Sequence, residues 1–269
     1  MYAVLFVYPA LQMVWTSFTQ QGLIVAGEFT GFANYRRLLG DARFWRAASN
    51  TASFVAMTVV PGTLIGLLLG LMVSRLKAPV QGIVLAVLFL PYMLPVSTVV
   101  LIWQWVIYWP LQTVWPLIFG KPLQITSQSY FVLPLVAVIT VWWTAGFNVL
   151  IFVAGLKAIP PELGEAARID GAGPLQRFFL ITWPLIWPVT VLVLTIQLIW
   201  QIKVFDQVYL FAQGTRPDAS IVLVQYIYLL AFQQDKGGYA ATVAVALVLM
   251  VLAISVLQMQ LRRLRGALA

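Results

Sequence analysis

Residues 47–74 read AASNTASFVAMTVVPGTLIGLLLGLMVS and contain no Asp, Glu, Lys or Arg. About 20 apolar residues are enough to cross the hydrocarbon core of a bilayer, about 30 Å thick, as an α-helix. In a soluble protein, water would meet most of this apolar surface. The stretch therefore indicates a membrane-spanning helix, and the rest of the chain repeats its pattern.

The composition of the whole chain is consistent with lipid as its solvent. Apolar residues make up 62% of the sequence and charged residues 9%, whereas soluble domains carry about 25% charged residues. The net charge of +8 comes from basic residues at the ends of apolar runs. That placement is typical of membrane proteins, and no basic face is long enough to follow nucleic-acid phosphates.

Several kinds of chemistry are excluded by residues that the sequence lacks. The chain has no Cys and no His, so it has neither thiol chemistry nor His-ligated metals. No G-x-x-x-x-G-K-[ST] phosphate loop occurs, so the chain does not hydrolyse ATP through that motif. We expect no catalytic residue, no metal and no cofactor in this chain.

Six runs are long and apolar enough to span a bilayer, and helices are the expected form because lipid offers unpaired backbone groups no partner. The expected spans are approximately 1–19, 50–75, 81–107, 131–156, 184–210 and 238–261. The first run lacks the charged start and small-residue cleavage site of a signal peptide, so we expect a true first helix. With the N-terminus inside, basic residues are nearly equal on the two sides, and the positive-inside rule does not decide the orientation.

One segment breaks the apolar pattern. Residues 157–184 read KAIPPELGEAARIDGAGPLQRFFLITWP and hold three acidic and three basic residues. Pro160-Pro161 favours a helix start, because the first turn needs no N–H. Asp170-Gly171 is a turn signal, after which Gly173-Pro174 restarts a helix. The segment is therefore predicted to form two short helices with a bend between them.

This segment resembles the cytoplasmic loop of ABC importer permeases, whose pattern is E-A-A, three residues, G, nine residues, I-x-L-P. The match is carried by Glu165-Ala166-Ala167, Gly171, Ile181 and Pro184. Trp183 stands where Leu is usual, so the detail of docking is expected to differ at that position. The alternative is a juxtamembrane helical hairpin without a special role.

The resemblance extends over most of the chain, to the sugar-type (maltose/glycerol-phosphate-like) family of binding-protein-dependent permeases. Similar segments are FTGFANY at 29–35, NT at 50–51, LPYMLP at 90–95, GLKAIPPEL at 155–163, IDGAGP at 169–174 and KVFDQVY at 203–209. Members often have a G-G-P turn after the last segment, whereas this chain reads QGTRP at 213–217. Contacts with a binding protein there are expected to differ from those of relatives.

The resemblance implies a multi-pass permease subunit of the bacterial or archaeal cytoplasmic membrane. The whole chain, 1–269, would be one transmembrane permease domain of six helices, with a cytoplasmic coupling loop over 157–183 between the fourth and fifth. The ATPase-coupling residues would be Glu165, Ala166, Ala167, Asp170 and Gly171. Glu165 would pair with a polar or basic group, the alanines would permit close packing, and Gly171 would set the bend.

The resemblance also implies the partners and the energy source. A second permease subunit would complete a heterodimer, and two ATPase subunits would bind ATP and Mg and hydrolyse the ATP. An extracytoplasmic solute-binding protein would deliver the solute, and the bilayer would surround the spans. No nucleic-acid partner is expected.

A solute path is predicted from helical spacing in the two spans that flank the loop. Thr140, Trp143, Thr144 and Phe147 recur at i, i+3, i+4 and i+7, and Gln197, Trp200 and Gln201 repeat that spacing. Relatives bind sugar on the corresponding helices, and aromatic faces with amides suit neutral sugar rings and hydroxyls. The alternative is that Gln and Thr join helices by hydrogen bonds while Trp fills space.

Two other functions compete with an ATP-driven importer. An ion-coupled secondary transporter would need ionisable residues near the centres of its spans, and these spans have almost none. A non-transporting membrane scaffold would not need a charged loop with this spacing.

Overall fold

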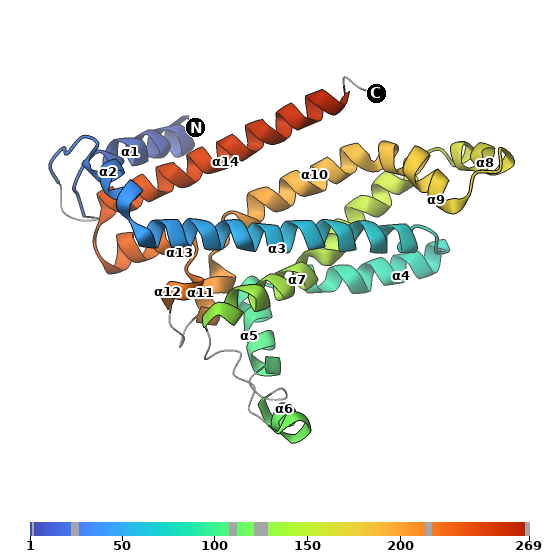
Figure 1. Ribbon diagram of the computed structural model, residues 1–269, viewed down its shortest axis with the longest axis horizontal. Coiled ribbons are helices and arrows are strands. Elements are labelled where there is room, and N and C mark those ends of the chain that lie inside the picture. Colours follow the sequence, from blue (N-terminus) through green and yellow to red (C-terminus); the bar gives the residue numbers. More distant parts are fainter. Residues whose placement is uncertain (2, 23–26, 108–111, 121–128, 213–216, 267–269) are drawn as a thin grey trace. The chain divides into compact units, whose positions relative to one another are not determined.

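The computed structural model describes residues 1, 3–22, 27–107, 112–120, 129–212 and 217–266. These ranges are almost entirely helical (Figure 1), and their β-type pairing is limited to an isolated bridge between Thr19 and Phe29. The α-helices are α1 (Tyr8–Ser17), α2 (Ala33–Gly40), α3 (Ala42–Val73), α4 (Ala78–Phe89), α5 (Val96–Val106), α6 (Gln112–Phe119), α7 (Ser129–Lys157), α8 (Pro161–Ile169), α9 (Pro174–Arg177), α10 (Trp183–Gln201), α11 (Asp206–Ala212), α12 (Pro217–Ser220), α13 (Leu223–Tyr228) and α14 (Gly237–Gly266).

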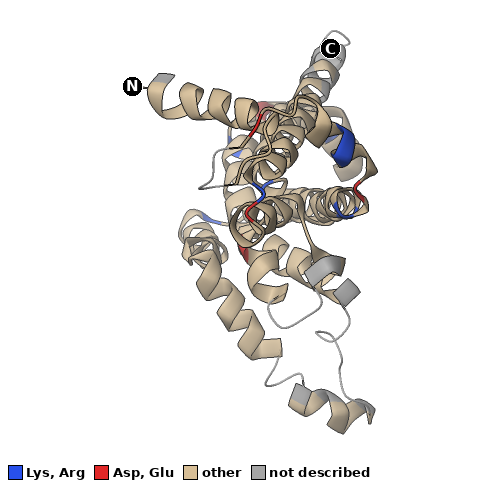
Figure 2. Cartoon of the chain, turned by 90° about the vertical axis from the view of Figure 1, so that its left-hand side faces the viewer, with Lys and Arg blue, Asp and Glu red and all other residues tan. Residues whose placement is uncertain are grey.

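The longest helices have the length and composition of membrane spans. Four stretches qualify, Ala42–Val73, Phe131–Lys157, Pro174–Gln201 and Gly237–Val256, and a bent pair of helices raises the number to five. The protein is thus a multi-pass helical membrane protein, and a count of six spans remains a prediction. Figure 2 shows long uncharged stretches of helix, with the charged residues gathered at helix ends and connections.

The expected third span, 81–107, is not one continuous helix. Helix α4 passes through a 3-10 turn at Leu90–Met93 and is followed by α5 after a bend of 95°. Pro91 lies in the 3-10 turn and Pro95 immediately precedes α5. Proline has no N–H to donate and clashes with the preceding turn, so two prolines in this short stretch explain the break.

The ends of the fifth and first expected spans also differ from the sequence interpretation. Helix α10 ends at Gln201 rather than near 210, and α11 begins separately at Asp206. The first run forms the apolar helix Val4–Ser17, which is shorter than the full-length spans. The turn at 213–217 falls largely on residues 213–216, which lie outside the described ranges.

The described chain forms two compact units. The first comprises Met1–Ser53, Ile125–Leu133 and Ile202–Ala269, and the second Phe54–Gln124 and Pro134–Gln201. In the first unit α1, α2 and α13 all pack against α14. Its core is built from aliphatic and aromatic side chains of α2, the start of α3, α13 with the residues that flank it, and α14: Leu38, Phe44, Ala47, Ile221, Leu223, Tyr226, Leu229, Leu230, Ala231, Tyr239, Ala240, Val243 and Leu247.

Polar side chains bind backbone carbonyls at the helix ends of the first unit. The Asn34 amide donates to the carbonyl oxygens of Ser17 and Thr19, at 3.0 and 2.9 Å. The Asn50 amide donates to those of Ala219 and Ile221, both at 2.9 Å. These bonds supply donors to carbonyl oxygens near helix ends and turns, where helical partners run out; the Ser17 carbonyl oxygen also accepts from the Thr242 hydroxyl at 3.0 Å. Asn34 and Asn50 belong to the segments at 29–35 and 50–51 that resemble the permease family.

Asp41 joins three helices of the first unit. Its carboxylate accepts hydrogen bonds from the hydroxyls of Tyr226 and Tyr239, both at 2.5 Å, and from the N–H of Arg43 at 2.9 Å. Burial alone would raise the pKa of Asp41, but these hydrogen bonds to its charged form hold the pKa below its ordinary value. The Arg37 guanidinium lies 4.5 Å from the centre of the Tyr239 ring.

Glycine sets the helix spacing in the second unit. Gly62, Gly66 and Gly70 recur every four residues along α3 and therefore share one face. A Cβ at Gly66 would lie 2.7 Å from the Asn148 Cβ on α7, and one at Gly70 would lie 2.8 Å from the Phe152 Cβ. Small residues let helices approach closely in lipid, where van der Waals packing drives association.

Helix α7 makes further close approaches in the same unit. Gly146 lies against the backbone of Leu88 and Phe89 on α4, and Gly155 against Ile186 and Val189 on α10. Helices α3, α4 and α10 thus all pack closely against α7 at glycine positions. Gln81 closes the end of α3 by donating to the Val73 carbonyl oxygen at 2.8 Å.

We predict that Gly66→Ala lowers the thermal stability of the detergent-solubilised protein. The new methyl group would overlap Asn148, and overpacking of this kind costs about 1–3 kcal/mol. Gly82→Ala is the matched control, because a Cβ there meets nothing within 4 Å and alanine is the better helix former. Equal melting temperatures for the two variants would contradict the close α3–α7 packing.

We also predict a pH-dependent contribution from Asp41. A carboxyl whose folded pKa is depressed stabilises the fold above its unfolded pKa of about 3.9, and loses that contribution as the pH falls through the folded pKa. Asp41→Asn replaces an acceptor with a donor nitrogen and should cost about 1–3 kcal/mol at pH 7. The gap in melting temperature between wild type and variant should narrow below about pH 4; a constant gap would contradict this role.

Candidate functional site

The first helix of the charged loop begins at a proline pair. Pro160 precedes α8 and Pro161 is its first residue, where a missing N–H is harmless. Glu162 lies in the first turn and Arg168 in the last, each at the end of the helix dipole that suits its charge. Local sequence alone therefore favours this short helix.

The end of α8 is fixed by Gly171. Its φ is +81°, in the left-handed region that favours glycine. The Gly171 N–H donates to the Arg168 carbonyl oxygen at 3.1 Å, and the Ala172 N–H to that of Ala167 at 2.9 Å. This pair of bonds is the Schellman helix stop. A Cβ at Gly171 meets nothing within 4 Å, so the requirement for glycine comes from the backbone.

Helix α8 presents a mixed face to its surroundings. Glu165 and Ala166 are exposed and Ala167 is half-buried. Ile169 lies one turn further on and is 87% exposed. The exposed residues of α8 thus offer a carboxylate, a small side chain and an uncovered aliphatic chain, which suit a protein contact.

The chain then turns into the next span. The Gly173 N–H, just before α9, donates to the Gln176 side-chain oxygen at 3.0 Å. Pro174 is the first residue of α9, which continues through a π-helical turn at Phe178–Thr182 into α10. The short helix α8 and a glycine bend therefore connect α7 to a continuous helix that begins at Pro174, and the predicted second short helix is the start of that span. Asp170 is an exposed residue at the bend.

Three residues of the predicted solute path meet in one aromatic cluster. Phe147 and Trp200 have ring centroids 5.2 Å apart. Tyr92 stacks on Phe147 at 5.1 Å and on Trp200 at 6.0 Å, and lies 6.2 Å from Trp143. Trp200 is 39% exposed, and the indole N–H of Trp143 is buried without a hydrogen-bond partner in the described structure. We call Tyr92, Trp143, Phe147 and Trp200 the aromatic cluster.

Other residues predicted for the path are buried in helix packing. The hydroxyls of Thr140 and Thr144 donate to carbonyl oxygens one turn earlier in α7, at 2.7 and 2.8 Å. The Gln197 amide donates to the Thr63 hydroxyl at 3.0 Å. Only the Gln197 contact joins two helices, α10 and α3, and so matches the alternative that polar residues join helices. The threonine bonds stay within α7, and Gln201 is also buried.

The structure adds residues that the sequence interpretation did not single out. Tyr92 comes from the turn between α4 and α5, and only its place in LPYMLP at 90–95 marked it. Asn148 is buried and donates to the Gly62 carbonyl oxygen at 3.2 Å. In the sequence, the four-residue repeat of Gly62, Gly66 and Gly70 is the pattern that indicates this close helix contact.

Comparisons with known proteins agree on one class. A family model described as "Binding-protein-dependent transport system inner membrane component" matches residues 62–266. The sulfoquinovosyl glycerol transport system permease protein of Agrobacterium fabrum is 31% identical over 98% of this chain and 86% of its own length. The lactose transport system permease protein of Rhizobium radiobacter is 30% identical over 98% of this chain and 90% of its own length.

Solved structures give the same fold. One chain of a bacterial ABC transporter involved in the import of the acidic polysaccharide alginate superposes with a TM-score of 0.86 at 22% identity, covering 97% of this chain and 91% of that one. One chain of a bacterial alginate ABC transporter in complex with an alginate pentasaccharide-bound periplasmic protein gives a TM-score of 0.82 at 23% identity, covering 96% and 88%.

Proposed function

This chain belongs to the binding-protein-dependent transport system inner membrane component family, and from that premise we propose that it forms half of the pathway of an ATP-driven carbohydrate importer. The observation that carries the carbohydrate assignment is the aromatic cluster, with Tyr92 stacked on Phe147 and Trp200. Relatives named for sulfoquinovosyl glycerol and lactose transport support the same class of solute.

The chemistry of the aromatic cluster suits a sugar. Sugar rings present C–H faces that pack on aromatic rings and hydroxyls that need hydrogen-bond partners. The partly exposed Trp200 offers a ring face, and the unpaired indole N–H of Trp143 offers a donor. We assign Trp143, Phe147 and Trp200 to the solute path together with Tyr92. Thr140, Thr144, Gln197 and Gln201 shape the path through helix packing.

The loop over 157–183 is the proposed contact with the ATPase. Glu165 offers a carboxylate, Ala166 and Ala167 leave room for a close partner surface, and Gly171 fixes the turn that follows Asp170. When the ATPases close on ATP, α8 would move with them, and α7 and α10 would follow because the loop joins both. We place this loop on the cytoplasmic side of a bacterial or archaeal cytoplasmic membrane.

The proposal includes the partners that such a machine requires. A second permease subunit, forming a heterodimer, supplies the other half of the pathway, and two ATPase subunits bind ATP and Mg. An extracytoplasmic binding protein delivers the solute. An ion-coupled transporter is disfavoured because the expected spans are almost free of ionisable residues.

We predict that Gly171→Pro uncouples ATP hydrolysis from uptake. Proline fixes φ near −65° and cannot donate the hydrogen bond to Arg168. A penalty of about 3 kcal/mol corresponds to about a hundredfold change in the population of the native loop. In proteoliposomes with the cognate binding protein, uptake should fall while ATP hydrolysis persists.

Gly164→Ala is the control for this experiment. Gly164 lies within α8, and a Cβ there meets nothing within 4 Å, so uptake should remain near that of the wild type. Normal uptake with binding-protein-stimulated hydrolysis in Gly171→Pro would refute the coupling assignment.

We predict that Trp200→Ala weakens solute transport. Loss of one stacking partner removes about 0.5–1.5 kcal/mol of interaction free energy with the solute, beyond the contribution of buried area. This corresponds to about a two- to tenfold rise in KM for uptake. Initial uptake rates for a panel of labelled disaccharides would measure the effect. Trp105→Ala is the control, since Trp105 lies exposed on α5. Equal effects of the two substitutions would contradict a path through the aromatic cluster.

A further inference from the structure

A cavity of about 440 Å³ lies at the base of the charged loop, wholly within the second unit. We call it the loop-base cavity. It is lined by the ends of α3 and α7, by the start of α8, and by α9 with the π-helical turn that follows it. Pro160, Pro161 and Gly164 form the part of its wall that belongs to the coupling loop.

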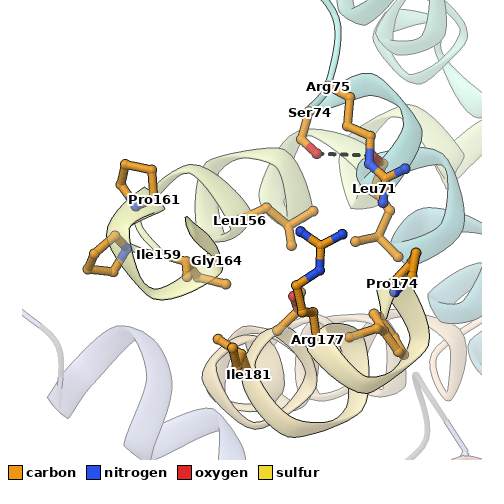
Figure 3. A pocket seen from close by; sticks show the side chains of 13 residues that line it. Leu71, Ser74, Arg75, Leu156, Ile159, Pro161, Gly164, Pro174, Arg177 and Ile181 are labelled. Atoms are coloured by element: carbon orange, nitrogen blue, oxygen red, sulfur yellow. Dashed lines mark hydrogen bonds between the residues drawn. The ribbon is translucent and has the colours of Figure 1, made fainter. Parts of the chain in front are cut away.

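The loop-base cavity carries positive charge without compensation from its own wall. Arg75 and Arg177 line it, and none of its lining residues, all of them described, bears a carboxylate. The Nε–H of Arg177 is buried and has no hydrogen-bond partner among the described residues. Figure 3 shows the Arg177 side chain directed into the space between Leu156 and Leu71, with Arg75 beyond it. A buried donor on a cation without a partner is costly, which favours an anion in the cavity.

The lining also places the cavity at the edge of the membrane. Arg75 follows the span Ala42–Val73, Leu156 lies in the last turn of Phe131–Lys157, and Arg177 lies in the first turn of Pro174–Gln201. Three apolar spans thus end around one basic cavity. Charged side chains at such ends meet the headgroup layer of a bilayer.

We propose that the loop-base cavity binds a phosphate group, and that its source is an anionic phospholipid of the surrounding leaflet. A guanidinium presents paired N–H donors that match two phosphate oxygens. Leu71, Leu156, Phe178 and Ile181 supply an apolar wall beside the arginines, which suits the acyl part of a lipid and not a free ion. Basic pockets between membrane helices are known to hold anionic headgroups.

A bound headgroup would stabilise the coupling loop in one position. It would bridge Arg177 on α9 and Arg75 beyond α3 while touching the wall formed by Pro161 and Gly164. Lipid binding to the purified complex is measured directly and is independent of the solute and of transport.

The test uses the complete transporter containing this chain, purified and placed in phosphatidylcholine nanodiscs with a small fraction of phosphatidylglycerol. Phosphatidylglycerol bound to the protein is quantified by mass spectrometry after extraction and washing, for wild type, Arg177→Gln and Arg75→Gln. Lys77→Gln is the matched control, since it removes one positive charge two residues from Arg75 but does not line the cavity. Inorganic phosphate is added as competitor in a parallel series.

We expect Arg177→Gln to bind phosphatidylglycerol about tenfold more weakly, equivalent to about 1.4 kcal/mol, with Lys77→Gln unchanged. Arg75→Gln should show a loss in the same direction, and it decides the test if Arg177→Gln fails to assemble. A third outcome is that wild type retains no lipid but binds inorganic phosphate, and the arginine variants do not. That result would support an anion site in the cavity but overturn its assignment to a phospholipid. Equal lipid and phosphate binding by wild type and both arginine variants would overturn the proposal.

Discussion

Close backbone contact between α3 and α7, permitted by Gly62, Gly66 and Gly70, is the constraint on which the second unit depends. In water, burial of apolar surface would hold such helices together, but lipid tails are as apolar as leucine and give no such driving force. Van der Waals contact and a few hydrogen bonds must hold the helices together. Glycine favours such contact because it has no side chain to keep the two helices apart. Asn148 and Phe152 fit against the glycine face, and the Asn148 amide reaches the Gly62 carbonyl oxygen.

The contact bears on the proposed function because α7 carries Phe147 of the aromatic cluster and leads directly into the loop proposed to contact the ATPase. Phe147 of the aromatic cluster and Lys157 at the helix end are about 15 Å apart along α7, at 1.5 Å per residue. Between them Phe152 is fully buried and Gly155 packs on α10. Helix α7 is therefore closely packed along the length that separates the cluster from the loop. The break between α4 and α5 contributes to the aromatic cluster, because the turn at Leu90–Met93 brings Tyr92 onto Phe147.

The charged loop combines a rigid local structure with an uncovered surface. The helix stop at Gly171 and the capping of α9 by Gln176 are satisfied within the loop itself, so α8 keeps its shape without a partner. Ile169 and Leu175 remain largely exposed, which leaves apolar surface for a partner to cover. The same loop contributes Pro160, Pro161, Gly164 and Arg177 to the wall of the loop-base cavity, and Arg75 lines it from beyond α3. The proposed ATPase contact and the proposed anion site thus share one segment.

The sequence by itself determined the membrane class, most of the spans, and the short helix α8 with the bend after it, but not that the helix from Pro174 runs on into the fifth span. Apolar run length, the Pro160-Pro161 start and the Gly171 stop are local signals that act within a few residues. It did not determine the end of α10 at Gln201, where no Gly or Pro marks the stop, or the sharpness of the bend at Pro91 and Pro95. Only the tertiary structure decided that Tyr92 joins Trp143, Phe147 and Trp200, while Gln197 bonds Thr63. The physical reason is that periodicity defines the face on which a side chain lies, whereas packing between helices decides what that face meets.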